Sequence, residues 1–241
     1  MKKFITTLVL ILGITLGCQA RTFVLIAGIS NYGNANNNLC QTTKDAKRFK
    51  SLMETQTKDI TILTSKNVTR INLLEKLRAI CKRAQENDRI VFFYSGHGSP
   101  GAMCGYDGNI PYEDVIKTLS QSAAKEKICF IDACFSGSMS EAINGDQSWM
   151  SNATSSGDIL LMVACRPDEF SYESPMVGAG YFTQALLKGM CGKSDVNADK
   201  NITVEELFRY VYGDVIKRTK GVQHPQLIGP KGFYNKIVTK W

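Results

Sequence analysis

Two segments near the middle of the chain decide the fold: Ile90-Val-Phe-Phe-Tyr-Ser-Gly-His-Gly98 and Lys127-Ile-Cys-Phe-Ile-Asp-Ala-Cys-Phe-Ser-Gly137. Each begins as an apolar, β-branched run, which is typical of a strand buried on both faces of a parallel sheet. Each ends in small residues around one reactive side chain, His97 in the first segment and Cys134 in the second. Since ligands bind at the carboxyl ends of parallel strands, neighbouring strands would bring both side chains to the same rim.

The rest of the chain alternates strand and helix patterns around these two segments. Further strands are predicted at 22–30, 60–64 and 159–164, with a last edge strand at 233–238. Helices are predicted at 44–54, 70–86, 113–120, 182–190 and 204–217. This order is typical of a doubly wound α/β sheet in one domain, with right-handed crossovers. Residues 136–157, rich in Ser, Asn and Gly, are predicted to form a long exposed loop.

Residues 1–20 are predicted to be a secretory signal peptide, which leaves 21–241 as the mature domain. Lys2 and Lys3 give the positive start, and the apolar stretch that follows is shorter than the ~20 residues of a membrane span. The alternative is a lipoprotein signal with Cys18 lipidated, but no polar tether separates Cys18 from the first strand. We therefore expect an exported chain, periplasmic or secreted, with no membrane span after cleavage.

The composition fits a globular protein and excludes several classes. Of 241 residues, 44% are hydrophobic and 21% charged, which excludes a disordered or low-complexity chain. The net charge of +7 falls to +5 when the two lysines of residues 1–20 are removed, and it is not clustered, so no nucleic-acid partner is expected. Seven cysteines remain, without the paired spacing of a zinc site. The sequence leaves open the possibility of one or two disulfides among six of them: Cys40, Cys81, Cys104, Cys129, Cys165 and Cys191.

Cys134 and His97 have the chemistry of a nucleophile and its base. A thiol becomes a strong nucleophile when its pKa falls below the usual value of about 8.5, or when a base stands beside it. Imidazole titrates near neutrality, so His97 can take the thiol proton and later return it to a leaving amine. The backbone amides of Gly98 and Cys134 are candidates to stabilise the oxyanion. By contrast, Cys129 is predicted to be a buried apolar residue, and His224 a structural loop residue.

These residues resemble the caspase-like cysteine peptidases, and the metacaspase branch with its bacterial members more than the animal caspases. The resemblance rests on Tyr94-Ser-Gly-His-Gly98 and Asp132-Ala-Cys-Phe-Ser-Gly137, with 37 positions from His97 to Cys134. It extends over most of the mature chain, to matches at 23–32, 45–46, 166–169, 180–183 and 223–226. It implies a caspase-like three-layer α/β/α sandwich with a mostly parallel central sheet, and a Cys134/His97 dyad that hydrolyses peptide bonds.

The resemblance also implies which type of substrate residue precedes the scissile bond. The family's substrate-pocket positions match Asp132, Asp45 and Ser95 in this chain. A carboxylate at the bottom of a pocket favours Arg or Lys through charge-assisted hydrogen bonds. We therefore expect an endopeptidase that cleaves proteins or peptides after Arg or Lys. The plainer alternatives are a strand-end turn residue for Asp132 and a solvated helix acid for Asp45.

The loop after the nucleophile has a consequence for activation. No Lys or Arg occurs between Lys127 and Arg166. An enzyme that cuts after basic residues cannot cut itself there, so we expect a chain that is active without cleavage. Metacaspase-like chains are often monomers, and we expect a monomer here.

An acidic run, residues 195–206, is similar to an EF-hand calcium loop, although Lys200 stands where the usual Gly is expected. The alternative is a helix capping box, because Glu206 follows Thr203 by three residues. The dyad needs no cofactor, and calcium is a candidate ligand at this loop. Its candidate ligands are Asp195, Asn197, Asp199, Asn201 and Glu206. The resemblance also leaves open calcium bound elsewhere, as in some metacaspases, through surface acids that this sequence does not identify.

Two further hypotheses stay open on the sequence alone. One keeps the dyad but assigns the chain to the related clostripain and gingipain groups. The other is a catalytically silent caspase-like binding module, which the presence of Cys134, His97 and Asp132 disfavours. A reactive Cys134 thiol separates the enzyme hypotheses from the silent one.

Overall fold

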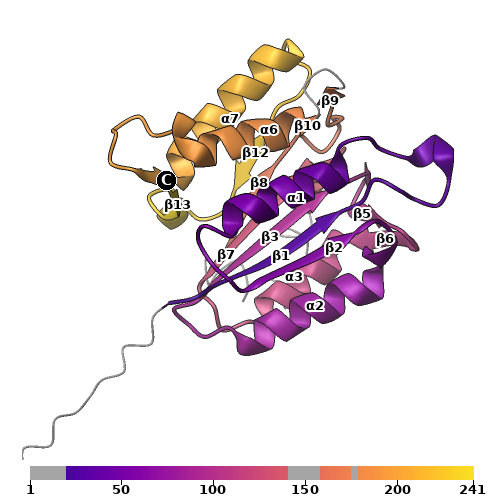
Figure 1. The fold of residues 1–241 in the computed structure, drawn as a ribbon, viewed down its shortest axis with the longest axis horizontal. Coiled ribbons are helices and arrows are strands. Elements are labelled where there is room, and N and C mark those ends of the chain that lie inside the picture. Colours follow the sequence, from indigo (N-terminus) through magenta and orange to yellow (C-terminus); the bar gives the residue numbers. More distant parts are fainter. Residues whose placement is uncertain (1–19, 141–157, 175–178) are drawn as a thin grey trace, which may run out of the picture.

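A computed structural model describes residues 20–140, 158–174 and 179–241. Its centre is a six-stranded sheet of order β12-β8-β7-β3-β1-β2, with helices on both faces (Figure 1). Five strands are parallel: β1 (Thr22–Gly28), β2 (Ile60–Thr64), β3 (Arg89–Ser95), β7 (Glu126–Asp132) and β8 (Ile159–Val163). The predicted signal peptide, apart from Ala20, and positions 141–157 of the predicted loop lie outside the described residues.

Two helical layers enclose the sheet, as expected for a three-layer α/β/α sandwich. One face is covered by α2 (Arg70–Arg83) and α3 (Tyr112–Ser120), and the other by α1 (Thr42–Met53), α6 (Tyr181–Lys188) and α7 (Val204–Thr219). Successive side chains of a strand point to opposite faces. In β1, Phe23 and Leu25 pack with α2 and α3, whereas Val24 and Ile26 pack with α1, α6 and α7. The predicted fold class is confirmed.

Short elements surround this frame. A small sheet follows His97 and consists of β4 (Gly98–Ser99), β5 (Ala102–Gly105) and β6 (Gly108–Pro111). Two strand pairs stand apart from the main sheet: β9 (Glu173–Ser174) with β10 (Ala179–Gly180), and β11 (Asn201–Thr203) with β13 (Ile237–Lys240). Single turns occupy η1 (Ala35–Asn37), η2 (Ser65–Asn67), η3 (Ser136–Ser138), η4 (Gly189–Lys193) and η5 (Lys231–Phe233).

The edge of the main sheet differs from the expectation. The prediction of an edge strand at 233–238 is wrong. Phe233 ends a single helical turn, and β13 pairs with β11 instead of joining the main sheet. The true edge strand is β12 (Gln226–Ile228), which runs antiparallel to β8. Three half-buried residues after a proline carry too little periodicity to predict a strand.

Two other expectations concern the loop and the cysteines. The start of the predicted loop is ordered, since Ser136, Gly137 and Ser138 form a buried turn. The seven cysteines of the described ranges are all free, so none of the disulfides considered above is formed between them. No helix in the described part of the chain is long and apolar enough to cross a membrane.

The strand order places the site. The chain passes from β1 outward to β2 and then crosses back to β3 on the other side of β1, so the order reverses between β1 and β3. Ligands of open α/β sheets bind in the crevice at such a reversal, at the carboxyl ends of the strands. Strands β3 and β7 are neighbours in register, with Ser95 beside Asp132. The two motifs therefore end at the same rim, as predicted.

Candidate active site

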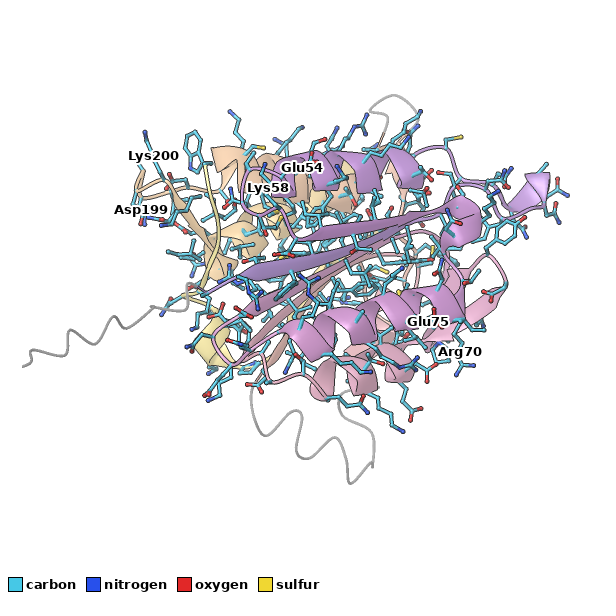
Figure 2. All side chains as sticks on the ribbon, turned by 60° about the horizontal axis from the view of Figure 1, so that its bottom comes forward. Glu54, Lys58, Arg70, Glu75, Asp199 and Lys200 are labelled. Atoms are coloured by element: carbon cyan, nitrogen blue, oxygen red, sulfur yellow. The ribbon has the colours of Figure 1, made fainter. Side chains whose placement is uncertain are left out.

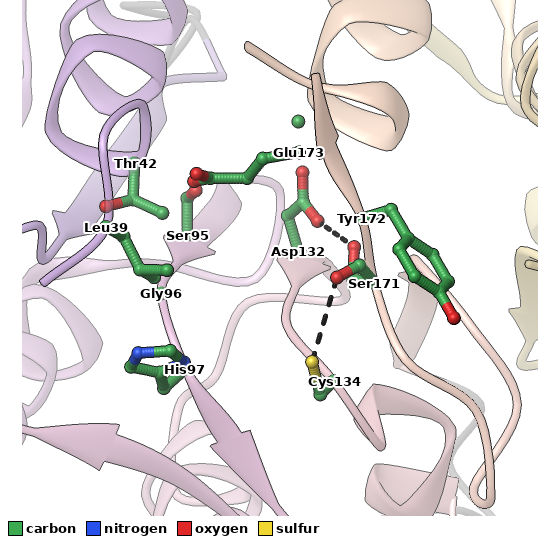
Figure 3. Close-up of a pocket in the computed structure, with 11 residues that line it drawn as sticks. Leu39, Thr42, Ser95, Gly96, His97, Asp132, Cys134, Ser171, Tyr172 and Glu173 are labelled. Carbon is green, nitrogen blue, oxygen red and sulfur yellow. Dashed lines mark hydrogen bonds between the residues drawn. The ribbon is translucent and has the colours of Figure 1, made fainter. Parts of the chain in front are cut away.

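A cavity of about 210 Å³ opens at this rim (Figure 3). Its walls come from the loop before α1, from the ends of β3 and β7, and from the segment that leads into β9. The lining residues are Leu39, Thr42, Ser95, Gly96, His97, Asp132, Cys134, Ser171, Tyr172, Glu173 and Gly180. The structure thus brings His97, Cys134, Asp132 and Ser95 to one cavity, whereas Asp45 does not line it.

His97 is held by contacts that fix its ring. Its Nε2 lies 2.9 Å from the backbone oxygen of Asn37. A carbonyl oxygen only accepts, so Nε2 carries the proton and Nδ1 of the neutral ring is left as the basic nitrogen. The Tyr32 ring packs against the imidazole, with ring centroids 4.9 Å apart. Asn37 and Tyr32 were not predicted as site residues; Asn37 contributes only a backbone carbonyl, which any residue type would provide.

The glycines beside His97 serve close packing and not a sharp turn. Neither Gly96 nor Gly98 has a positive φ. A Cβ on Gly98 would lie 2.1 Å from the backbone oxygen of Cys134, and one on Gly96 would lie 2.4 Å from the Tyr94 hydroxyl. The Gly96 amide already donates to the backbone oxygen of Asp132. Gly98 is thereby in close contact with the backbone at Cys134, where its amide was predicted to stabilise an oxyanion.

Cys134 follows the end of β7 in an unusual backbone turn. The next residue, Phe135, has φ 56° and ψ 19°, a left-handed conformation that is uncommon for a bulky side chain. Its amide donates to the backbone oxygen of Glu169, which holds the turn against the segment after β8. The Cys134 thiol points into the cavity and lies 3.7 Å from the Ser171 carbonyl oxygen (Figure 3). A strained residue at a reactive group is a recurrent feature of functional sites.

The thiol itself is not pre-ionised. Burial raises the pKa of Cys134, and the nearby carboxylates of Asp132 and Glu173 raise it further, while the Ser171 contact lowers it. Of the two routes to a reactive thiol considered from the sequence, a lowered pKa and an adjacent base, the direction of this shift does not favour the first. The largest cause is burial, and the two carboxylates add to it because they disfavour a second negative charge beside them. Activation of Cys134 therefore depends on a base that takes its proton.

Asp132 is buried at the bottom of the cavity, with 5% of its surface exposed. Its Oδ1 accepts a hydrogen bond of 2.6 Å from the Ser171 hydroxyl (Figure 3), and its Oδ2 accepts from the Thr183 hydroxyl and amide at 2.6 and 3.1 Å. Burial nevertheless raises the pKa of this carboxyl. A Cβ on Gly180 would lie 2.5 Å from Oδ2, so this glycine leaves room for the carboxylate.

Asp45 lies behind the cavity wall and is fully buried. Its Oδ2 accepts from the Gly180 amide at 3.1 Å, and its Oδ1 lies 3.3 Å from an Arg48 nitrogen. Burial raises the pKa of Asp45 to about 7, and the Asp132 charge adds to this rise. Asp45 is therefore a charge behind the pocket and not a solvated helix acid.

Glu173 is a third carboxylate of the cavity, which the sequence did not reveal. It lines the cavity, and its Oε1 is buried without a hydrogen-bond partner. Burial and the Asp132 charge raise its pKa, whereas the backbone amides of Cys40 and Gln41 lower it. A single Glu in an irregular stretch has no sequence signature, so only the three-dimensional arrangement identifies it.

The acidic run at 195–206 is closed by hydrogen bonds within the loop and to neighbouring residues. Asp195 Oδ2 accepts from the Lys200 amide and the Trp241 indole, and Asp199 Oδ1 accepts from the Asn201 amide. Glu206 forms the capping box with Thr203 that opens α7. Figure 2 shows Asp199 and Lys200 at the end of the molecule away from the carboxyl ends of the strands. No group of three or more His, Cys, Asp or Glu residues is placed to hold a metal in the part of the chain that the structure describes.

His224 lies outside the cavity and has a structural contact. Its Nδ1 lies 2.7 Å from Glu169 Oε1, and its amide donates to Glu169 Oε2. Since Glu169 also holds the Phe135 amide through its backbone, this pair fixes the segment behind the nucleophile. Cys129 is fully buried within β7. Both positions agree with the structural roles that the sequence suggested.

A family model described as the caspase domain matches residues 21–231. The chain belongs to the caspase-domain family of cysteine peptidases. This match covers the whole sheet and every described residue of the cavity. It favours the caspase and metacaspase group over the clostripain and gingipain groups considered from the sequence.

Similar proteins support the same family. Over 109 residues, or 41% of this chain, it is 34% identical to Metacaspase-1 of Scheffersomyces stipitis and 30% identical to Metacaspase-1 of Meyerozyma guilliermondii. The matches span 27% and 26% of those relatives' own lengths, about a quarter. The fold is similar to that of protein GSU0716 from Geobacter sulfurreducens, with a TM-score of 0.67 and 17% identity over 91% of this chain and 99% of that one.

Proposed function

We propose that this protein is a cysteine endopeptidase that hydrolyses peptide bonds after Arg or Lys. The observation that carries the proposal is the set of three carboxylates, Asp132, Glu173 and Asp45, around the cavity that holds Cys134. Among the described residues, Asp132 and Glu173 form no ion pair within 4.0 Å, although the Lys44 charge lowers the Glu173 pKa and Asp45 is paired with Arg48. Buried carboxylates without a counter-ion are costly, so a guanidinium or ammonium group of the substrate would supply the missing charge.

The geometry supports a two-step hydrolysis. In the first step the Cys134 sulfur bonds to the carbonyl carbon of the scissile bond, and its proton moves to His97 Nδ1. The amides of Gly98 and Cys134 donate to the oxyanion. His97 then protonates the leaving amine as the C–N bond breaks. In the second step water releases the acyl group, with His97 taking a water proton and Cys134 regaining its thiol.

The Asn37 carbonyl oxygen orients His97 for proton transfer. It accepts the Nε2 proton at 2.9 Å, so it keeps the tautomer in which Nδ1 is the base. It also stabilises the imidazolium that forms when His97 takes the thiol proton. The dyad of Cys134 and His97 therefore needs no third side chain.

The proposal includes an exported monomer that is active as one uncleaved chain. The predicted signal peptide at 1–20 supports export, and the lack of Lys and Arg between Lys127 and Arg166 supports activity without cleavage in that loop. No cofactor takes part in the chemistry. Calcium at 195–206 would act on the loop and not on the reaction, and a calcium-dependent shift of the melting temperature measures such binding.

Matched fluorogenic peptides that end in Arg, Lys or Asp test the proposed function. The purified chain should release the fluorophore from the Arg and Lys peptides only, and Cys134→Ala should abolish the release. Intact mass of the active sample reports whether the chain is cleaved between residues 136 and 157. Cleavage after Asp, or activity that persists in Cys134→Ala, would contradict the proposal.

A further inference from the structure

Both backbone polar groups of His97 are bonded to tyrosine hydroxyls. The His97 amide donates to the Tyr32 hydroxyl oxygen at 2.6 Å. The Tyr94 hydroxyl lies 2.8 Å from the His97 carbonyl oxygen and 2.8 Å from that of Cys104. The two tyrosines come from separate segments, Tyr94 from β3 and Tyr32 from the stretch between β1 and η1. Together with the Cys104 amide, which donates to the His97 carbonyl oxygen at 3.0 Å, these side chains hold a histidine that follows the end of its strand.

The two hydroxyls also meet each other and close a ring of hydrogen bonds. They are hydrogen-bonded, and both lie within 2.8 Å of the position that a Cβ on Gly96 would take. The proton directions follow by elimination, because an amide only donates and a carbonyl only accepts. The His97 N–H points to the Tyr32 oxygen, the Tyr32 O–H to the Tyr94 oxygen, and the Tyr94 O–H to the carbonyls of His97 and Cys104. The ring starts and ends on His97.

Tyr32 combines this ring with contacts to the imidazole itself. Its aromatic ring lies against that of His97 at 4.9 Å and 42°. The same stretch of chain carries Asn37, whose carbonyl takes the Nε2 proton. Asn38 anchors the stretch, because its side-chain oxygen accepts from the Tyr32 amide at 3.0 Å. The backbone amide, ring plane and tautomer of His97 are therefore all set from one short segment, whereas its carbonyl is held by Tyr94 and the Cys104 amide.

We propose that Tyr32 is a positioning residue for the reaction: with Tyr94 it forms a closed hydrogen-bonded ring that fixes His97 in the orientation needed to deprotonate Cys134. The inference rests on the proposed function, because it assigns His97 the role of base. A displacement of about 1 Å in a reacting group lowers a rate by about 100-fold. Removal of the Tyr32 hydroxyl leaves the His97 amide without its acceptor and frees the imidazole to shift.

Tyr32→Phe tests this with the intact chain, since the phenyl ring keeps the packing. We expect kcat for the Arg peptide to fall by about 10-fold to 100-fold with KM within about twofold. Tyr94→Phe should act in the same direction. Because both hydroxyls belong to one ring, the double variant should lose no more than the worse single variant. Tyr212→Phe, which removes an exposed hydroxyl on α7, is the matched control and should behave as the wild type.

A second readout needs no substrate and separates this inference from the proposed specificity. The rate at which iodoacetamide alkylates Cys134 is measured against pH for the wild type, Tyr32→Phe and His97→Ala. Tyr32→Phe should shift the profile to higher pH, toward that of His97→Ala. If the wild type cleaves neither Arg nor Lys peptides, the proposed function fails. The pH dependence of Cys134 alkylation then tests the positioning role of Tyr32 without any substrate. A Tyr32→Phe variant with a lower melting temperature but unchanged kcat and alkylation profile would overturn it, as would losses that multiply in the double variant.

Discussion

Two acidic regions of this molecule have opposite electrostatics. At the cavity, Asp45, Asp132 and Glu173 are buried or half-buried, and burial raises the pKa of each. At the loop 195–206, Asp195 is half-buried and burial alone would raise its pKa, but hydrogen bonds, first among them those from the Lys200 amide and the Trp241 indole, lower it. Both regions are rich in acidic residues in the sequence. In the first region burial outweighs the hydrogen bonds that the carboxylates accept, whereas in the second the hydrogen bonds outweigh burial.

The difference shows what makes a group of acids a binding site. Carboxylates that accept hydrogen bonds from their own loop stabilise that loop and gain little from a ligand. Carboxylates held together in a poorly solvated cavity repel one another and gain from an incoming cation. The cavity is therefore the region where a positive side chain would bind.

The largest effect is expected from removal of a charge at the cavity. Asp132→Asn should lower kcat/KM for the Arg peptide by about 100-fold or more, because the substrate cation loses a buried partner. Asp199→Asn, a matched change in the exposed loop, should leave kcat/KM within about twofold of the wild type. Steady-state kinetics at pH 8, with the melting temperature of each variant as a folding control, measures both. Equal losses in the two variants would remove the contrast.

The second effect concerns stability and pH at Asp45. Its pKa is about 7 in the folded chain, against 3.8 for an unperturbed aspartate in water. Between these values the folded chain binds more protons than the unfolded chain, so this group lowers stability as the pH rises from about 4 to about 7. Asp45→Asn should therefore be more stable than the parent at pH 8, by about 2–4 kcal/mol, with little difference near pH 4.

Denaturant unfolding of both chains at the two pH values, in the Cys134→Ala background to prevent self-cleavage, checks the Asp45 prediction. Asp199→Asn should show no such pH-dependent gain. A lower stability of Asp45→Asn at pH 8 would mean that the ionised carboxylate is stabilising at this position, contrary to the burial argument.

A third effect links the cavity charge to the nucleophile. Asp132 and Glu173 help to raise the pKa of Cys134, so a small cation bound between them should lower that pKa. Methylguanidinium should accelerate alkylation of Cys134 at pH 7.5 by about threefold to tenfold. The same salt should not accelerate alkylation in Asp132→Asn. A rate that is unchanged or slower in the wild type would contradict the prediction.

The smallest effect is expected at the loop. Asp195→Asn weakens the hydrogen bonds from the Lys200 amide and the Trp241 indole, which lie away from the cavity. The melting temperature should fall by no more than about 3 °C, and kcat/KM should not change. Differential scanning calorimetry and the peptide assay measure the two quantities. A loss of activity here would show that the loop is coupled to the cavity.

The sequence predicted the parallel strands well because each is a continuous apolar run buried on both faces. It missed β12, whose three residues are half-buried and lie at the sheet edge. In the site, it predicted the residues that line the cavity at strand ends, such as Cys134 and Asp132. It could not predict Asn37, which contributes a backbone carbonyl, or Glu173, which reaches the cavity from a segment about 40 residues after Cys134.

Under the proposed function, the cavity recognises a positive charge before the scissile bond. The most direct test is the ratio of kcat/KM for two peptides that differ only in Arg against citrulline, which has the same shape without the charge. Two carboxylates that line the cavity, with Asp45 behind its wall, predict a ratio of at least about 100 at pH 8, which should decrease as the pH falls through 7 and Asp45 takes up a proton. A ratio near one at every pH would contradict the account.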